Sequence, residues 1–548
     1  MTETTQGQTI ARASAWMALG TIVSRLTGFL RVALLAWVIG VSLNADLFDA
    51  ANSIPNALYI LVAGGIFNVV LVPQLVRAMK NDADGGDAYA NRVITLGIVV
   101  LGLATVALMI AVPLVMRVVF DDTLFTAALD EQRRSAALLM VLCMPQVFFY
   151  GVFVLAGQVL NARSRFGPMM WAPIVNNVVA CGVVLAYYVF FGASSGRDGF
   201  TTSEAVLLGL GSTVAIALQA VILLPYLRRA GFHYRPRFDF RGVGLGHTLR
   251  LGGWTLLFIV VNQIAYLVVI RIASGANIQG AVDALAAAGL AVYSLGFLVS
   301  QLPHGVITVS LATAVIPTLA ALAADEDHDR FRVELARTVR LSLVVIVPIA
   351  VALACLGQPT AAIAGGVGSL GGNTVAIGQT IQAFSVAMIA FTVHYLMLRG
   401  FYAAEDTRTP FFIQVVIAAV NIVAAVVLTS LVDPYRVAMM LALSYGIAYV
   451  VGSILSVTLL SRRIGPIVDR EMVTFVVRLV VATGLAAFVA LGTAHGLDAA
   501  GVEPARAVGG LVTTVVAGLA GAVTYVAAAR VVGLTQLGYL VSSLRRRG

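Results

Sequence analysis

Residues 13–40, ASAWMALGTIVSRLTGFLRVALLAWVIG, decide how this chain folds. The stretch is apolar and longer than the about 20 residues that a helix needs to cross a bilayer. It nevertheless carries Arg25 near its middle and Arg31 six residues later, and each arginine opposes membrane insertion by roughly 2.5–3.5 kcal/mol at a helix centre. The two arginine side chains either reach the headgroup layer or face a water-filled cavity that receives an anion. We favour the second interpretation, because charges inside membranes usually mark a pathway.

The composition predicts an all-α polytopic membrane protein. Hydrophobic residues make up 60% of the 548 positions and charged residues 11%, whereas soluble domains carry about 25% charged residues. The net charge of +9 comes from short segments between apolar spans, so the positive-inside rule explains it and we expect no nucleic-acid partner. The residues before position 13 lack a basic region and a cleavage site, so 13–40 is predicted to be a retained helix and not a signal peptide. Cys143, Cys181 and Cys355 lie in apolar spans and predict no disulfide framework.

A hydropathy window of about 19 residues predicts 14 transmembrane helices. They lie near residues 13–40, 46–76, 92–116, 135–160, 168–192, 204–227, 248–273, 284–322, 339–357, 376–398, 410–431, 437–461, 473–494 and 508–530. Most basic residues fall on the side of the N-terminus, so we expect both termini in the cytoplasm of a bacterium and the helices in its inner membrane. Pro55 and Pro303 interrupt the second and eighth spans and are predicted hinges.

A weak internal repeat predicts the domain organisation. Ile54-Pro55 and the later Val72-Pro73 are similar to Leu302-Pro303 and the later Ile316-Pro317. The repeat predicts two pseudo-symmetric six-helix lobes, an arrangement typical of transporters, unless proline-containing turns recur here by chance. The predicted boundaries are residues 1–228 for the N-lobe, 229–463 for the C-lobe, 464–530 for two further helices and 531–548 for a basic tail, which either lies at the inner interface or begins a longer segment.

The first span supplies the candidate chemistry. Arg25 and Arg31 carry permanent, fork-shaped charges that suit bidentate contacts with phosphate. Six residues apart on a helix, they point about 120° from each other. Gly28 either permits a bend that brings them together or allows close helix packing. Ser24 either donates to a phosphate oxygen or bonds within its own helix.

Other polar residues form a second group of candidates. Asp46 and Asp49, at the outer mouth of the second span, either form a gate ion pair with Arg31 or begin a helix in solvent. Asn262 and Gln301 are candidate contacts to sugar or peptide, although a hydrogen bond between helices is the commoner role of such residues. The sequence presents no catalytic constellation and no metal-ligand cluster, so we expect no catalytic residue, metal or cofactor.

The residues of the first span also resemble a known family. Ser24–Arg31, SRLTGFLR, is similar to the SRxxGxxR signature of the MurJ (MviN) lipid II flippases, which share the MOP superfamily with the MATE exporters. The segments Asn44–Phe48 and Pro55-Asn56, and Gly400–Tyr402 with Asp406–Pro410, also resemble that family. The resemblance implies a carrier that moves undecaprenyl-pyrophosphate-linked peptidoglycan precursor from the inner to the outer leaflet.

Several positions depart from the family pattern. Val32 stands where many members have aspartate, and Ala57 and Leu298 stand where they have arginine. Arg271, near the outer end of the seventh span, either compensates for these losses or reaches the headgroup layer. A charged sodium site is not expected, because carboxylates are missing from spans 248–273, 410–431 and 437–461.

These observations predict a lipid II flippase that works by alternating access. Its expected partners are lipid II, membrane lipids and proteins of cell-wall synthesis and division. Alternatives are a flippase for another polyprenyl-linked glycan, a MATE-like exporter, and a membrane enzyme acting on lipid-linked sugars. Such an enzyme needs acids in a large outer loop, whereas the acidic cluster Asp325–Asp329 is predicted on the cytoplasmic side. A membrane scaffold would not need arginines in the middle of a span.

Overall fold

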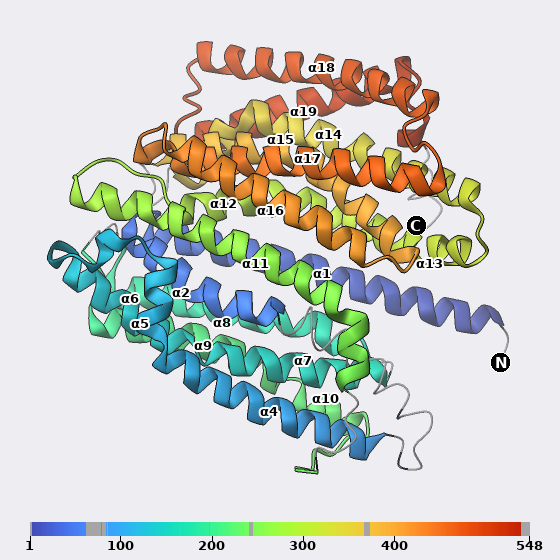
Figure 1. Ribbon diagram of the computed structural model, residues 1–548. Coiled ribbons are helices and arrows are strands. Elements are labelled where there is room, and N and C mark those ends of the chain that lie inside the picture. The colour runs from blue at the N-terminus through green and yellow to red at the C-terminus, as the bar shows by residue number, and fades with distance from the viewer. Residues whose placement is uncertain are drawn as a thin grey trace. The chain divides into compact units, whose positions relative to one another are not determined.

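The computed structural model describes residues 3–61, 78, 84, 86–163, 165–194, 196, 198–239, 245–365 and 373–538. Side chains are described at these positions except at 3–18, 22, 245–252, 364 and 365. Helices dominate the described part of the chain, which contains no strand (Figure 1). The predicted all-α fold is confirmed.

The helices match the predicted membrane spans. Thirteen segments of the described part are long and apolar enough to cross a membrane, and they coincide with 13 of the 14 predicted spans. The remaining predicted span, 46–76, begins as α2 (Leu43–Ile60), and residues 62–77 lie outside the described part, together with the Val72-Pro73 half of the repeat. Most of the predicted basic tail also lies outside it.

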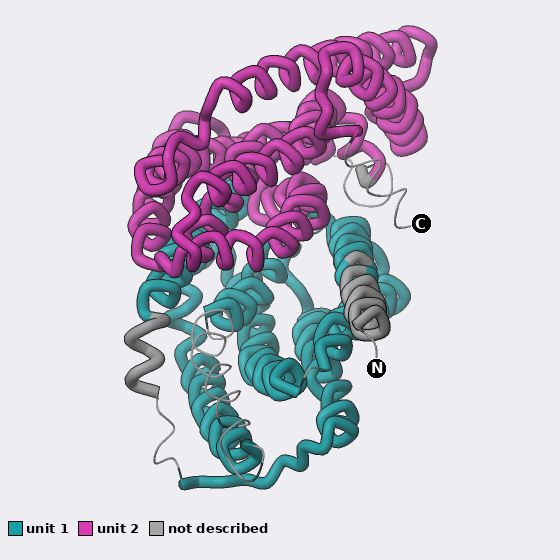
Figure 2. The backbone as a smooth tube through the Cα atoms, turned by 90° about the vertical axis from the view of Figure 1, so that its right-hand side faces the viewer, with its two compact units in different colours: residues 1–283 teal, residues 284–548 magenta. Residues whose placement is uncertain are grey.

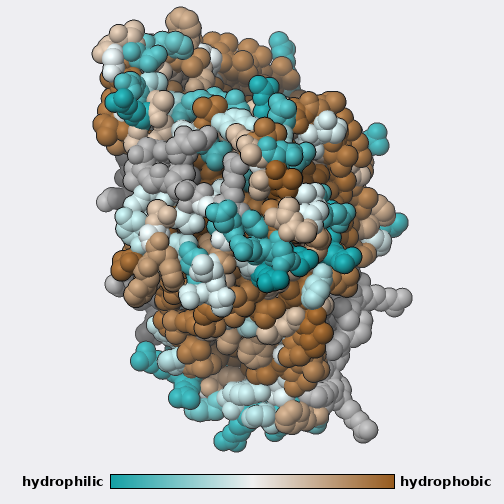
Figure 3. Space-filling model, turned by 90° about the vertical axis from the view of Figure 1, so that its left-hand side faces the viewer, coloured by the Kyte–Doolittle hydropathy of each residue, from teal (hydrophilic) through white to brown (hydrophobic). Residues whose placement is uncertain are grey.

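The surface is that of a protein embedded in lipid. Val189 and Phe190 expose 75% of their area and Phe488 exposes 78%. Hydrophobic side chains cover broad areas of the face drawn in Figure 3, beside clusters of polar groups. Exposed apolar areas of this extent indicate contact with acyl chains and not with water.

Two compact units divide the chain after Asp283 (Figure 2). The first unit contains α1 (Glu3–Ile39), α2 (Leu43–Ile60), α4 (Asp87–Ile110), α5 (Val112–Val119), the 3-10 helices η2 (Asp122–Phe125) and η3 (Ala127–Leu129), α6 (Asp130–Cys143), α7 (Gln146–Ala162), α8 (Gly167–Phe191), α9 (Thr202–Val221), α10 (Leu224–Arg229) and α11 (Leu245–Val282). The second contains α12 (Leu290–Pro303), the π-helix η4 (His304–Thr308), α13 (Val309–Ala324), α14 (His328–Gly365), α15 (Thr374–Ala403), α16 (Arg408–Thr429), η5 (Pro434–Arg436), α17 (Val437–Ile464), α18 (Arg470–Ala499) and α19 (Ala507–Val531).

The same helix pairs recur in the two units. In the first unit α4 packs on α7, α7 packs on α9 and α2, and α8 packs on α9. In the second unit α14 packs on α15, α15 packs on α17 and α12, and α16 packs on α17. Taken in chain order, the third span packs on the fourth, the fourth on the sixth and second, and the fifth on the sixth of each half. This recurrence supports the predicted pseudo-symmetry, and the predicted lobe boundaries stay predictions.

Helix α11 is the seventh span, yet it packs within the first unit. It lies against α2, α5 and η2. Gln263 on α11 donates to the carbonyl of Ala57 at 3.2 Å, and the hydroxyls of Tyr266 and Ser53 lie 3.4 Å apart. The repeat places the lobe boundary after residue 228, whereas packing divides the chain one helix later because of these contacts with α2.

The two predicted hinge prolines lie in different local structures. Pro303 is the last residue of α12, and the π-helix η4 follows it directly. Short π-helical turns widen a helix locally and are common at functional sites. Pro55 lies inside α2, which continues past it to Ile60. Their roles as hinges stay predictions.

Asp406 organises the turn between α15 and α16. Its Oδ1 accepts hydrogen bonds from the backbone N–H groups of Arg408 and Thr409, both at 3.0 Å. Its Oδ2 lies 2.6 Å from Nη1 of Arg463 on α17. Burial opposes ionisation of Asp406, but the hydrogen bonds from Thr409 and the charge of Arg463 outweigh it, so the pKa of Asp406 lies below its usual value.

The lowered pKa predicts a pH-dependent contribution to stability. Such a carboxylate stabilises the fold fully above its unfolded pKa of about 3.9, and this stabilisation is lost as the pH falls through the lower folded pKa. The substitution Asp406→Asn should therefore lower stability near neutral pH by about 1 kcal/mol. Thermal unfolding of the purified protein at about pH 6 and pH 3.5 should show this difference shrinking in acid. A difference that stays constant across this range would contradict the assignment.

Candidate functional site

Helix α1 lies against α8 through small residues. A Cβ added at Gly20 would lie 2.9 Å from Nε1 of Trp171, and one added at Gly28 would lie 3.4 Å from Nδ2 of Asn177. A larger residue at Gly20 would collide with the Trp171 ring, whereas a methyl group at Gly28 would make ordinary van der Waals contact with Asn177. Gly28 lies at the contact with α8, and its predicted roles in packing or bending stay predictions.

Asn177 joins the two helices at the centre of the arginine motif. Its Nδ2 donates to the carbonyl of Ser24 at 3.0 Å and to Oγ1 of Thr27 at 3.1 Å. The Thr27 hydroxyl lies 2.9 Å and 3.0 Å from the carbonyl oxygens of Val23 and Ser24. Asn177 is buried, and a side chain that enters the hydrogen-bond ladder of a neighbouring helix fixes its local course. Sequence reasoning missed this residue, although an amide inside an apolar span was an available signal.

Arg31 faces the interior of the first unit. It lies two helical turns from Ser24 and so on nearly the same side of α1. Its side chain is half-buried, and its charge acts on Tyr150 of α7 and Cys181 of α8. Tyr150 stacks on Tyr59 of α2, with ring centroids 4.6 Å apart.

Arg25 lies on another side of α1 and is exposed. Because α1 is one helix from Glu3 to Ile39, the two arginines stay on different faces and are not brought together. Within the described residues, neither arginine is paired with a carboxylate. An apolar helix whose two cations have no acidic partner among the described residues can accept an anion.

The start of α2 is held by an extensive polar contact. Asn44 and Gly199 exchange two hydrogen bonds, at 3.1 Å and 2.9 Å, and Ser42 donates to the carbonyl of Gly196 at 2.9 Å. Asp46 is fully buried, so it does not begin the helix in solvent as one interpretation held. Asp49 is half-buried, and its charge acts on Tyr266 of α11.

The remaining candidates lie on α11 and in the second unit. Asn262 is exposed on α11. Gln301 on α12 donates to the hydroxyl of Tyr445 on α17 at 3.3 Å, the helix-to-helix hydrogen bond that is common for such residues. His304 is buried, with Nδ1 2.9 Å from the hydroxyl of Thr392. Sequence reasoning missed the aromatic cluster around these residues: Tyr293, Phe297, Phe384, Phe391, Tyr445 and Tyr449.

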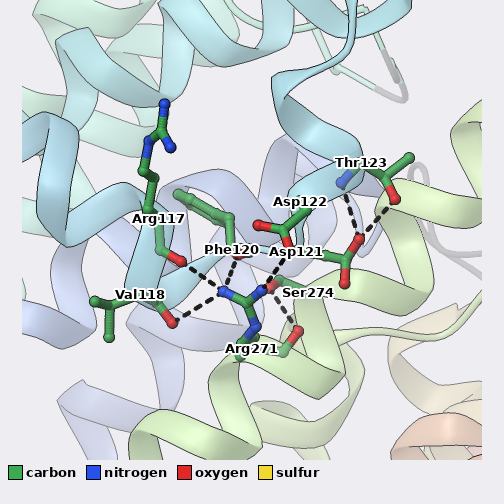
Figure 4. Close-up of polar contacts among 8 residues, drawn as sticks. All are labelled: Arg117, Val118, Phe120, Asp121, Asp122, Thr123, Arg271 and Ser274. Atoms are coloured by element: carbon green, nitrogen blue, oxygen red, sulfur yellow. Dashed lines mark hydrogen bonds and ion pairs between the residues drawn. The ribbon is translucent and has the colours of Figure 1, made fainter.

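Arg271 joins α11 to the end of α5 (Figure 4). Its Nη1 donates to the carbonyls of Arg117 and Phe120 at 2.5 Å and 2.6 Å, and its Nη2 lies 3.3 Å from the carboxylate of Asp122. Carbonyls at the C-terminal end of a helix carry partial negative charge and favour a cation. This guanidinium therefore contacts acceptors from its own chain.

Asp121 completes the arrangement around Arg271. It accepts hydrogen bonds from the backbone N–H of Thr123 at 3.0 Å and from its hydroxyl at 2.6 Å. Burial opposes ionisation of Asp121, but these hydrogen bonds and the charge of Arg271 outweigh it and hold its pKa below the usual value. The geometry assigns Arg271 a structural role, which is to hold α11 against the end of α5. Its contact with a substrate stays a prediction.

Recurring helix pairs in two units and a cationic first helix are features of a membrane transporter. A solved lipid II flippase MurJ in an inward closed conformation matches this fold with a TM-score of 0.71 at 18% identity, over 94% of this chain and 98% of the other. An inward-facing MATE family multidrug transporter of the MOP superfamily matches with a TM-score of 0.61 at 13% identity, over 81% and 98% of the two chains.

The sequence comparison identifies the family within this class. The family model for the lipid II flippase MurJ matches residues 35–509, and the chain belongs to this family. A probable lipid II flippase MurJ of Haemophilus influenzae is 27% identical over 414 residues, 73% of this chain and 77% of that protein. One of Rhizobium tropici is 28% identical over 418 residues, 74% and 73% of the two chains. The prediction of a transporter and not an enzyme is confirmed, while Arg25 and Arg31 lie before the matched region.

The contacts of Arg271 predict a measurable loss of stability. Replacing Arg271 by alanine removes hydrogen bonds from a charged donor, each of which contributes about 1.5–3 kcal/mol. Arg271→Ala should lower the unfolding temperature of the purified protein by a few degrees. The unfolding temperature of Arg271→Lys should lie between those of the wild type and Arg271→Ala. Arg134→Ala, at a side chain 77% exposed beside Asp130, is the matched control and should have little effect. An Arg271→Ala protein as stable as the wild type would refute this structural role.

Proposed function

We propose that this chain moves lipid II, an undecaprenyl-pyrophosphate-linked peptidoglycan precursor, from the inner to the outer leaflet by alternating access. The observation that carries the proposal is the permanent charge of Arg31, half-buried on the helix α1 that packs on α8, with no carboxylate partner among the described residues. Membership of a lipid II flippase family supports the choice of substrate.

The two arginines offer the pyrophosphate two successive positions. Six residues of helix separate them by about 9 Å along the axis of α1. Arg25 is exposed and attracts the anionic head first, and Arg31 binds it deeper in the first unit, where a lower dielectric strengthens the attraction. Each guanidinium forms bidentate hydrogen bonds to phosphate oxygens. The head group thus moves along α1 while its lipid tail stays among acyl chains.

Two acids at the outer end of α2 can drive the release of the head group. Asp46 is buried and Asp49 is half-buried. As the head group approaches the outer end, these carboxylates repel its phosphates and compete for Arg31. Pairing of either acid with Arg31 would return the carrier to its empty state.

The positive-inside distribution supports an orientation with both termini in the cytoplasm of the bacterial inner membrane. Proteins of cell-wall synthesis and division, which consume the exported precursor, are expected partners. The arginines select for pyrophosphate and not for the sugar. Purified protein in vesicles should therefore be tested with lipid II against other polyprenyl-pyrophosphate glycans, and preferential movement of another glycan would replace the substrate assigned here.

Charge-removing substitutions test the arginine positions. Arg25→Ala and Arg31→Ala should each abolish growth of a flippase-depleted strain while the protein stays in the membrane. Arg31→Lys should support partial growth, because lysine keeps the charge and loses the bidentate fork. Arg134→Ala serves as the control at an exposed site and should grow normally. Full growth of the Arg25→Ala, Arg31→Ala double variant at wild-type protein levels would refute the proposal.

The empty carrier should respond to membrane potential. An inside-negative potential favours inward return of a cationic site by up to about 2.3 kcal/mol per charge per 100 mV. Dissipating the potential without changing the pH should slow lipid II export in cells, measured by access of an external probe to the precursor. Export that continues at the same rate would remove this step from the mechanism.

A further inference from the structure

The segment after α10 forms an extended strap, residues 232–239, along the first turns of α4. The N–H of Arg235 donates to Oδ1 of Asn91 at 2.8 Å, and the N–H of Arg237 donates to Oγ1 of Thr95 at 3.0 Å. Four helical residues rise by about 6 Å and two extended residues by about 6.6 Å. This match of spacing lets alternate N–H groups of the strap bind successive turns of the helix.

Side chains fasten both ends of the strap. Near its start, Phe232 is buried and lies beneath the guanidinium of Arg163, whose carbon is 5.3 Å from the ring centroid. Arg163 also donates to the carbonyl of Ala230 at 2.7 Å and pairs with Asp87. At the other end, Asp239 lies 2.7 Å from Nε of Arg92. The strap is therefore a fixed surface of the first unit.

The outward side of the strap is basic. Alternate residues of an extended chain point to the same side, which places His233, Arg235 and Arg237 together, and all three are exposed. Other arginines exposed at the same helix ends are Arg165, Arg228 and Arg229. Three acids lie nearby: Asp87 pairs with Arg163, Asp239 pairs with Arg92, and Asp84 lies close enough to Arg237 for their charges to interact. The arginines of this surface outnumber these acids, so it keeps a net positive charge.

Exposed aromatic rings interleave with these arginines. Phe238 exposes 70% of its area, and Phe166 and Tyr226 are exposed as well. Tyr234 is partly exposed, with its hydroxyl 3.1 Å from Oγ1 of Thr95 on α4. Tyr226 lies under the guanidinium of Arg229, whose carbon is 5.9 Å from the ring centroid. In the chain, the strap comes directly after the membrane helix α9 and the short α10. It therefore lies at the level of the lipid headgroups. Aromatic rings concentrate at that level, and clustered arginines there bind lipid phosphates.

We propose that the strap, with α10 and the start of α8, docks anionic phospholipid headgroups of the leaflet that it faces. Guanidinium groups of Arg235 and Arg237 bind the phosphates, and the exposed rings lie among the glycerol and upper acyl groups. Because the strap lies between the sixth and seventh spans, bound lipid anchors this connection to the membrane surface. The proposal does not depend on the transported substrate.

Lipid binding to the purified full-length chain tests this proposal. Native mass spectrometry in detergent would compare phosphatidylglycerol with phosphatidylcholine of the same acyl chains. The wild type should prefer phosphatidylglycerol, and the preference should weaken as salt is added. Arg235→Gln with Arg237→Gln should lower phosphatidylglycerol affinity at least fivefold and leave phosphatidylcholine affinity unchanged.

Two controls separate lipid binding from general effects of charge or folding. Arg330→Gln with Arg470→Gln removes the same charge from exposed positions of the second unit and should keep wild-type binding. Thr95→Val keeps every charge but removes one anchor of the strap, and should lower phosphatidylglycerol affinity by about half. Wild-type binding by the Arg235→Gln, Arg237→Gln variant would overturn the proposal. So would tighter binding of an acidic peptide than of phosphatidylglycerol, which would assign the surface to a protein partner.

Discussion

A guanidinium keeps its proton in proteins, so an arginine inside a membrane helix needs polar surroundings at every stage of a transport cycle. Arg31 lies half-buried on α1, which packs on α8. That place depends on the contact between α1 and α8. Gly20 lets the helices approach beside Trp171, and Nδ2 of Asn177 donates to the carbonyl of Ser24. The first lobe is thus built to hold a charge that its apolar helix would otherwise exclude.

The features that depend on local composition were predictable from the sequence. An apolar segment must form a helix in lipid because its backbone has no other hydrogen-bond partners, so the spans follow from hydropathy alone. Arg25 and Arg31 are conspicuous for the same reason. Pro303 predicted an irregular helix because it lacks a backbone donor, and a π-helix begins at His304. In each case the cause lies within a few residues of the effect.

Features that depend on distant partners were not predictable. The packing of α11 with the first unit comes from contacts of Gln263 and Tyr266 with α2, while the repeat gave no sign of it. Asn91 and Thr95 look like the polar start of a membrane helix, and only the structure shows that they bind the backbone of a strap far along the chain. An amide or hydroxyl satisfies many different partners, so its presence does not specify which one it meets.

Three arginines of the first unit show how the same residue type acquires different roles. Arg163 contacts an acid, a carbonyl and an aromatic ring, and Arg271 contacts two carbonyls and an acid. Both meet acceptors supplied by the protein, and their binding energy stabilises the fold. Arg31 is half-buried without a carboxylate among the described residues, so its binding energy is available to an external anion. The role of each arginine follows from which acceptors the fold supplies, and neither charge nor position along a helix alone determines it.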